Sequence, residues 1–202
     1  MSTKTGKEAE SLMKNRREPM PTNGAGRDTW LSTHGRDLRF LAVFGLLMAG
    51  YYVLTTTDAS EKRFFPWYLK ATTDVAGATL HAVGYSEVSV SGNDLVGRKG
   101  RITVERGCDA VAPTALFVSA VIASPAAVGF KAVAVVFGVA ILMVVNLIRI
   151  ITLFLTAIHW PAAFDVMHLD VWQAAFIFLA IVLWALWASW AAKRARAGRA
   201  IA

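Results

Sequence analysis

Four apolar segments constrain this chain more than any other feature of its sequence. They are residues 40–54, 110–128, 132–158 and 171–192, and Arg149 carries the only formal charge within them. Three of them approach or exceed the roughly 20 apolar residues that a helix needs to cross the hydrocarbon of a bilayer. Because 55% of the residues are hydrophobic, more than in an ordinary soluble domain, we predict an all-α integral membrane protein.

The first apolar segment is short but extends to a spanning length at its ends. Arg39 can snorkel to one interface, and the threonines at 55–57 lie at the other. This segment begins far into the chain and lacks a small-residue cleavage site, so we expect a retained span and not a signal peptide. The four transmembrane helices are then expected at about 38–57, 109–128, 131–158 and 171–192.

The net charge of +7 is distributed unevenly along the chain. Residues 1–39 carry eight Lys or Arg against five acids, and residues 193–202 carry four with no acid, whereas the stretch between the first two spans is balanced. The positive-inside rule therefore predicts that both termini are cytoplasmic, which agrees with an even number of spans. A nucleic-acid partner is not expected, because the cations flank spans and form no basic face with interleaved aromatics.

Three regions follow from this pattern. We expect a disordered basic cytoplasmic tail over 1–37, a transmembrane domain over 38–192 and a basic cytoplasmic tail over 193–202. Between the first and second spans, aromatic residues at 64–68 predict a small interfacial helix. Residues 88–104 then alternate apolar and polar around two turns, which predicts a β-hairpin or two outside the membrane.

Cys108 is the only cysteine, so an intrachain disulfide and a cysteine-cluster metal site are excluded. Pro113 is tolerated only near a helix start, so the second span should begin between Asp109 and Ala112. Cys108 then lies at a helix N-terminus, where the dipole and a nearby cation lower the thiol pKa, whereas burial against lipid raises it. An inert, buried thiol is the alternative.

Arg149 and two histidines are expected at the same end of the helices as Cys108. Arg149 lies roughly 27 Å along its helix from the cytoplasmic turn at 1.5 Å per residue, and Asn146 shares its helix face. Arg149 is either an interfacial snorkeller or a functional residue facing the bundle. A cysteine and a histidine can form a nucleophile–base pair with an arginine that holds the oxyanion, and by chemistry alone His159 and His168 are equal candidates.

Three motifs carry a resemblance to a known family. "GRITVERGCDAVAPT", "NLIRIITLFL" and "FDVMHLDVWQ" resemble the exosortase and archaeosortase family over about residues 40–190, with the short exosortase H type most similar. The resemblance implies an extracytoplasmic cysteine endopeptidase or transpeptidase of the bacterial inner membrane that cleaves C-terminal sorting signals of the PEP-CTERM kind. It implies that Cys108 is the nucleophile, Arg149 the electrostatic stabiliser and His168 the proton-transfer residue, with Asn146 in support.

One position departs from the family pattern. Family members commonly have Asn-Gly or Ser-Gly after the cysteine, whereas this chain has Asp109 and Ala110. The Asp109 carboxylate opposes thiolate formation by its charge, or accepts backbone amides at the helix start.

Partners and alternatives complete the expectations. The partners are sorting-signal segments and membrane lipid, with no cofactor or metal, and the oligomeric state stays open. Two other classes are a non-catalytic scaffold or export subunit, in which Arg149 pairs with an acid of another chain, and a small transporter, in which Arg149 lines the path.

Overall fold

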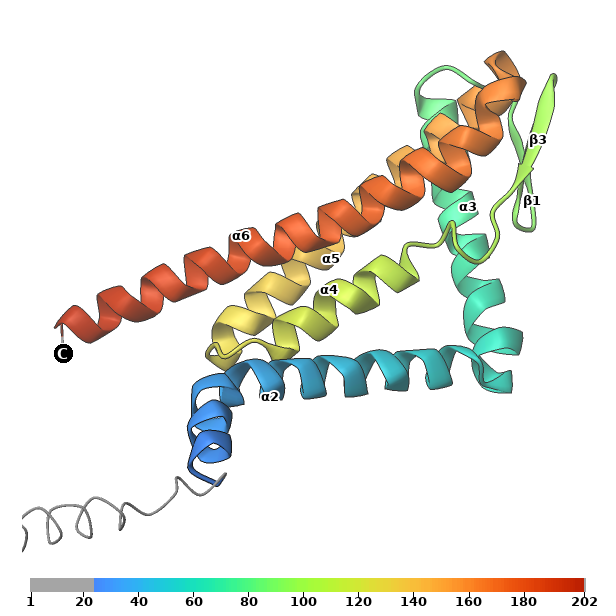
Figure 1. Ribbon diagram of the computed structural model, residues 1–202. Coiled ribbons are helices and arrows are strands. Elements are labelled where there is room, and N and C mark those ends of the chain that lie inside the picture. Colours follow the sequence, from blue (N-terminus) through green and yellow to red (C-terminus); the bar gives the residue numbers. More distant parts are fainter. Residues whose placement is uncertain (1–23, 202) are drawn as a thin grey trace, which may run out of the picture. The chain divides into compact units, whose positions relative to one another are not determined.

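The computed structural model describes residues 24–201, and the side chains of residues 34–196. The chain divides into two units at Arg39, and the site lies within the second, Phe40–Ala202. Figure 1 shows the elements, which are α2 (Gly24–Thr55), the π-helix η2 (Ser60–Phe64), α3 (Phe65–Ala82), β1 (Ser89–Ser91), β2 (Asp94–Gly97), β3 (Gly100–Thr103), α4 (Val111–Ala123), α5 (Val128–His159), the 3₁₀ turn η3 (Pro161–Ala163), the π-helix η4 (Val166–Val171) and α6 (Trp172–Ile201).

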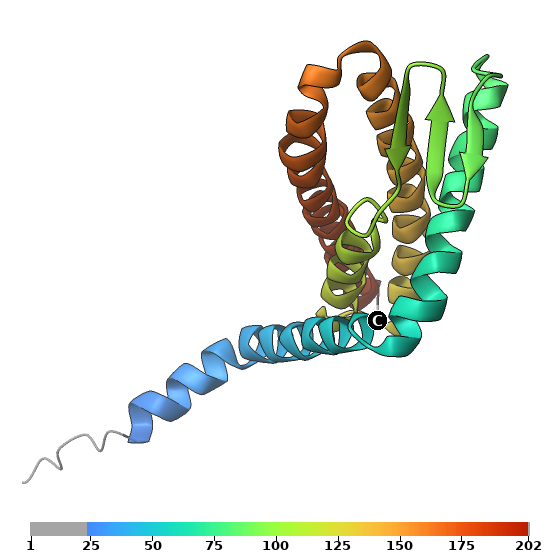
Figure 2. The same ribbon diagram turned by 90° about the vertical axis from the view of Figure 1, so that its right-hand side faces the viewer.

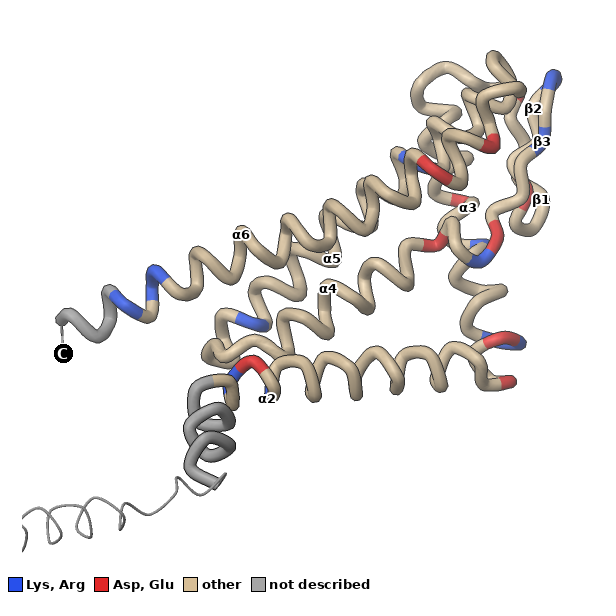
Figure 3. The backbone as a smooth tube through the Cα atoms, in the orientation of Figure 1, with Lys and Arg blue, Asp and Glu red and all other residues tan. Residues whose placement is uncertain are grey.

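Three helical stretches are long and apolar enough to cross a membrane. They are His34–Thr55 in α2, Val128–His159, which is α5, and Pro161–Arg196, which contains most of α6. Figure 3 shows α4, α5 and α6 largely free of charge along their middles, with charged residues gathered toward their ends. Many large apolar side chains on the outer faces of α5 and α6 are exposed, as expected for surfaces that contact lipid. The chain is an integral membrane protein.

The second predicted span is shorter in the structure than expected. α4 has 13 residues, about 20 Å at 1.5 Å per residue, which is less than the roughly 30 Å hydrocarbon core. It ends at Ala123 because Ser124 precedes Pro125 and adopts an extended conformation (ψ 144°). The expected boundary near 128 is therefore wrong, and four complete spans stay a prediction.

The expected boundaries of the two tails also differ from the structure. Helix α2 already begins at Gly24, so residues 24–37 are helical where a disordered tail was predicted, and residues 1–23 lie outside the described part. No proline interrupts the chain between Pro21 and Pro66, so the helix of the apolar segment continues toward the N-terminus without losing backbone hydrogen bonds. At the other end, α6 continues through the predicted tail to Ile201.

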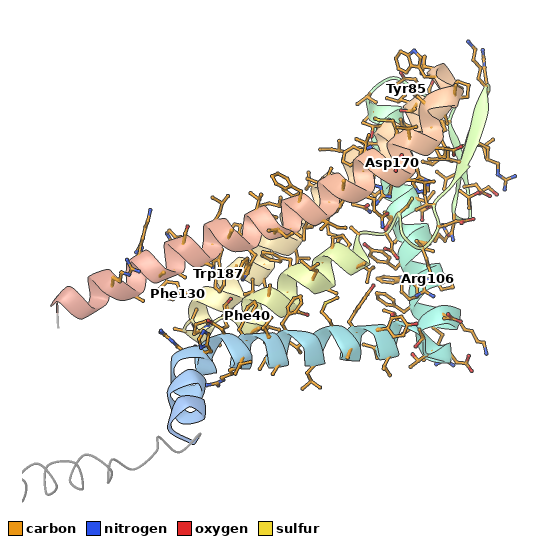
Figure 4. All side chains as sticks on the ribbon, in the orientation of Figure 1. Phe40, Tyr85, Arg106, Phe130, Asp170 and Trp187 are labelled. Atoms are coloured by element: carbon orange, nitrogen blue, oxygen red, sulfur yellow. The ribbon has the colours of Figure 1, made fainter. Side chains whose placement is uncertain are left out.

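Helices α4, α5 and α6 pack against one another around a core of apolar residues. Gly138 on α5 permits the closest approach, because a Cβ atom there would collide with the ring of Phe117 on α4. At the α4–α5 turn, Trp184 Nε1 donates to Ser124 Oγ (3.0 Å) and Trp187 Nε1 donates to the Phe130 carbonyl (3.1 Å). Figure 4 labels Trp187 and Phe130. These bonds hold α6 against the turn.

A three-stranded antiparallel sheet of order β1-β2-β3 precedes α4. The register pairs Ser91 with Asp94 and Gly97 with Gly100, so both connections are two-residue hairpin turns, and the predicted hairpins are confirmed. Figure 2 shows β1 beside α3 and β3 on the far side of the sheet. Helix α3 buries one face, formed by Phe65, Leu69, Thr73, Ala76, Gly77 and Leu80. Its partners are α5 and the sheet.

Candidate functional site

A tight loop between β3 and α4 presents Cys108. The Cys108 amide donates to the Glu105 carbonyl (3.0 Å), and two residues of the loop have left-handed backbones, Gly107 (φ 98°) and Ala110 (φ 54°). Ala110 is the N-cap of α4, which begins at Val111. The predicted helix start between 109 and 112 is therefore confirmed, and Cys108 lies three residues before it.

His168 contacts the Cys108 sulfur. Cys108 Sγ lies 2.8 Å from His168 Nε2, and His168 belongs to the π-helix η4, immediately before α6. Single π turns occur frequently at functional sites because they change which side chains share a helix face. A neutral imidazole has one acceptor nitrogen, so a thiol S–H can donate to Nε2 while Nδ1 carries the proton.

Burial favours the neutral form of the Cys108 thiol. Burial raises the pKa of Cys108 above its ordinary value, and the nearby Asp109 and Glu105 charges raise it further. The positive charge of Arg149 lowers this pKa but offsets the burial effect only in part. Of the two opposing effects that the sequence left open, burial is the larger, because Cys108 is only 7% exposed and water cannot solvate the anion.

Arg149 is buried against the same loop. It is 2% exposed, its Nη1 donates to the Gly107 carbonyl (3.0 Å), and its Cζ lies 5.5 Å from the centroid of the Phe176 ring. Its Nε has no hydrogen-bond partner, and no carboxylate forms an ion pair with it within the described residues. An uncompensated buried cation is costly for stability and marks function in membrane helices.

Asn146 lies one helical turn from Arg149 on the buried face of α5. It is 1% exposed, and neither its Oδ1 nor its Nδ2 has a hydrogen-bond partner in the described part of the chain. Thr114 Oγ1 on α4 and Trp172 Nε1 on α6 are likewise buried and unpaired. No hydrogen bond joins the Asn146 side chain to Cys108 or His168 in the described part of the chain.

Asp109 organises the start of α4. Its Oδ1 accepts the Val111 amide (3.1 Å), so the carboxylate serves as a backbone acceptor, as one of the two sequence interpretations expected. Its carbonyl accepts the Tyr68 hydroxyl of α3 (2.7 Å). Burial, followed by the charge of Asp109, raises the pKa of Tyr68, which keeps that hydroxyl protonated as the donor.

Tyr68 and Arg106 are two residues of the site that the sequence did not predict. Arg106 Nη1 pairs with Glu61 Oε1 (3.1 Å), Nη2 donates to the Thr55 carbonyl (3.3 Å), and Cζ lies 4.3 Å from the centroid of the Phe65 ring. Figure 4 shows Arg106 beside α3. These contacts anchor the Cys108 loop to the end of α2 and to η2 and α3. The partners lie 41 to 51 residues away, and no local pattern predicts such pairs.

The other candidate histidine is elsewhere. His159 is exposed at the end of α5, its Nδ1 donates to the Leu155 carbonyl (2.9 Å), and its ring lies 5.6 Å from that of Trp160. Of the two histidines left equal by chemistry, the one in contact with the sulfur is His168.

A small pocket opens beside the Cys108–His168 pair. Its lining is mostly apolar and comes from β3, the Cys108 loop, α5 and the segment between α5 and α6: Ile102, Thr103, Val104, Cys108, Ile150, Leu153, Phe164 and His168. Among the described residues, no group of three His, Cys, Asp or Glu is close enough to hold a metal ion.

Comparison with known proteins adds one finding. The family model described as transmembrane exosortase matches residues 29–188, which include the Cys108 loop, α5 and His168. The search of curated proteins and the search of solved structures gave no match.

Proposed function

Because this chain belongs to the transmembrane exosortase family, we propose that it is a membrane-embedded cysteine endopeptidase or transpeptidase. Its substrates are exported proteins with a C-terminal sorting signal of the PEP-CTERM kind, cleaved at the outer face of a bacterial inner membrane. The observation that carries the proposal is the 2.8 Å contact between Cys108 Sγ and His168 Nε2, beside the buried and incompletely paired Arg149.

The acylation step starts from a neutral Cys108 thiol and a neutral His168 imidazole. His168 Nε2 takes the thiol proton as the Cys108 sulfur attacks the scissile carbonyl carbon, because a preformed thiolate is disfavoured by burial. Arg149 stabilises the negative charge that develops on the carbonyl oxygen, and its bond to the Gly107 carbonyl holds it next to the nucleophile. The imidazolium then returns the proton to the leaving amine, and the C–N bond breaks to leave a thioester on Cys108.

The second step resolves the thioester. A water, amine or lipid hydroxyl attacks its carbonyl while His168 accepts the proton, and the thiol of Cys108 leaves with that proton. Water gives hydrolysis and the other acceptors give transfer. Because the Cys108–His168 pair is buried, water reaches the thioester slowly and hydrolysis is slow. An acceptor bound in the pocket can still attack the thioester.

The distribution of basic residues supports the proposed orientation. The basic residues of the N-terminal region and of residues 193–202 favour cytoplasmic termini. The sheet, α3 and the Cys108 loop then lie on the opposite side, where an exported substrate arrives.

The test is reporter cleavage in cells. A secreted reporter with a C-terminal sorting signal from the same genome is co-expressed with the wild type or with Cys108→Ala, Cys108→Ser, Arg149→Gln, His168→Gln or His159→Gln, and reporter size is followed by blotting. We expect cleavage by the wild type and His159→Gln only, with all variants equally abundant. Cleavage by Cys108→Ala would show that Cys108 is not the nucleophile, and absence of cleavage by the wild type for every sorting signal of the genome would favour the scaffold or transport alternatives.

A further inference from the structure

The free edge of the sheet lies beside Cys108. In the order β1-β2-β3, strand β3 is an edge strand, and among the described strands it pairs only with β2. Residues 102–104 at its end line the same pocket as Cys108 and His168. Figure 2 shows this edge on the side of the sheet away from α3. A peptide that pairs with β3 therefore passes the nucleophile.

The register shows which backbone groups point outward from β3. The Val104 amide donates to the Asn93 carbonyl at 2.8 Å, so Val104 directs its backbone toward β2. Backbone groups alternate in direction along an antiparallel strand, so those of Ile102 also point to β2. The amide and carbonyl groups of Thr103 and Arg101 therefore point to the open edge.

The side chains at this edge leave it uncovered. Arg101 and Thr103 are exposed, and both hydrogen-bond the Asp94 carboxylate on the neighbouring strand, Thr103 Oγ1 at 2.7 Å. Those bonds hold the two side chains over the face of the sheet and away from its edge. Edge strands are usually shielded by proline, bulges or covering elements. Helix α5 contacts β3 and shares a core with Ile102 and Val104 on its buried face, while the side chains of Arg101 and Thr103 on the other face stay exposed.

We propose that the substrate segment with the scissile bond binds in an extended conformation as a fourth strand on β3. Its backbone pairs with Thr103 and Arg101, as in other cases of strand addition, and this pairing brings the scissile carbonyl to Cys108. The apolar side chains of Ile102, Val104 and Leu153 in the pocket accept an apolar side chain of that segment. This inference rests on the proposed function and adds how the substrate is held.

Disulfide trapping tests the strand directly. Because Cys108 is the only cysteine, Thr103→Cys or Arg101→Cys in a Cys108→Ala background gives a single-thiol enzyme. The partner is a reporter that the wild type cleaves, with single cysteines placed in turn at the four positions on either side of the mapped cleavage site. Ser89→Cys is the matched control, because Ser89 is also exposed but belongs to β1 at the opposite edge.

A paired strand gives a recognisable pattern. Residues directly opposite have Cβ atoms about 4.5–5.5 Å apart and successive side chains alternate between faces, so Thr103→Cys should crosslink at one position and at least five-fold less at its two neighbours. With Arg101→Cys the best position should move by two residues, and the direction of the move gives the strand orientation. Ser89→Cys should give no preferred position.

Other results overturn the inference in distinguishable ways. If the wild type cleaves the reporter but the crosslinks do not alternate, or Ser89→Cys traps it equally well, the strand model is wrong and the proposed function stands. If the wild type cleaves no reporter, the proposed function fails and the inference fails with it. Should Thr103→Cys not accumulate, the Arg101→Cys pattern decides, since its side chain is exposed.

Discussion

Cys108 and His168 are 60 residues apart in sequence, and Cys108 Sγ lies 2.8 Å from His168 Nε2. The sulfur comes from a loop at the start of α4 and the ring from a π turn at the start of α6. Helices α4 and α6 pack against each other and run in the same direction (Figure 1), so their N-terminal ends meet. The pair is therefore a direct consequence of antiparallel packing against α5.

The first prediction concerns the reactivity of the thiol. Because burial raises the pKa of Cys108 and Arg149 lowers it, iodoacetamide should alkylate the wild type slowly at pH 7 and faster as the pH rises above the ordinary thiol pKa of about 8.5. Arg149→Gln removes the lowering charge, so its profile should move to higher pH. Ser89→Cys in a Cys108→Ala background is the exposed control with an ordinary profile. If alkylation of Cys108 rises at a lower pH than alkylation of this control, the proposal of a neutral Cys108 thiol beside a neutral His168 imidazole is contradicted.

The second prediction concerns Ala110, whose left-handed backbone (φ 54°) is unfavourable for a residue with a Cβ atom. Ala110→Gly relieves about 1 kcal/mol of strain but also removes a methyl group buried in the core (1% exposed), which costs about the same, so stability should change little, whereas Ala110→Val should destabilise the protein by at least about 1 kcal/mol. Thermal unfolding in detergent checks both. Ala112→Gly, within the first turn of α4, is the control and should lose up to about 1 kcal/mol. Wild-type stability in Ala110→Val would contradict the left-handed conformation.

The third prediction concerns helix packing at Gly138. A methyl group there meets the Phe117 ring, so Gly138→Ala should lower the free energy of unfolding by about 1–3 kcal/mol. Gly129→Ala, on the same helix and facing open space, should not destabilise the protein. Unfolding midpoints measured side by side in one detergent give the comparison, and equal midpoints would show that α4 and α5 do not approach as closely as described.

The fourth prediction concerns Arg106 as a positioning residue. Arg106→Ala removes the contacts that anchor the Cys108 loop to Thr55, Glu61 and Phe65, and reporter cleavage should slow roughly ten-fold, equivalent to about 1.4 kcal/mol. The loss should fall on kcat, because Arg106 does not line the pocket. Lys62→Ala is the control, since within the described part of the chain Lys62 forms just an exposed pair with Asp58, and it should retain full activity.

The fifth prediction concerns orientation. In a Cys108→Ala background, Lys99→Cys in the β2–β3 turn should react with a membrane-impermeant maleimide in intact spheroplasts. Arg194→Cys should react only after permeabilisation, because its end of α6 is expected in the cytoplasm. The reverse pattern would place the candidate site on the cytoplasmic side.

The apolar pattern predicted much of this fold. Long apolar segments predicted α5 and α6, and the alternation of apolar and polar residues predicted the hairpins. Pro113 located the start of α4. Each of these features depends on interactions between residues that are close in sequence. The length of α4 was wrong because hydropathy continues past Pro125 while the backbone cannot remain helical before it. The start of α2 was missed because a polar composition does not by itself stop a helix.

The site was predictable in its residue types more than in its electrostatics. Cys108, Arg149 and His168 could be placed at one end by following the helices, and the choice of His168 over His159 came from family resemblance. The π turn that presents His168 and the left-handed Ala110 leave no sequence pattern. Whether the pKa of the Cys108 thiol is raised or lowered depends on how deeply Cys108 is buried, and only the packed structure shows that depth.

The most direct test of the central claim is the covalent intermediate. Purified enzyme in detergent is mixed with the reporter and quenched in acid, and the adduct is followed by intact-protein mass spectrometry before and after neutral hydroxylamine. We predict a hydroxylamine-sensitive thioester between reporter and enzyme that is absent in Cys108→Ala and His168→Gln and present in His159→Gln. An adduct that survives in Cys108→Ala, or cleavage of the reporter by that variant, would contradict the account.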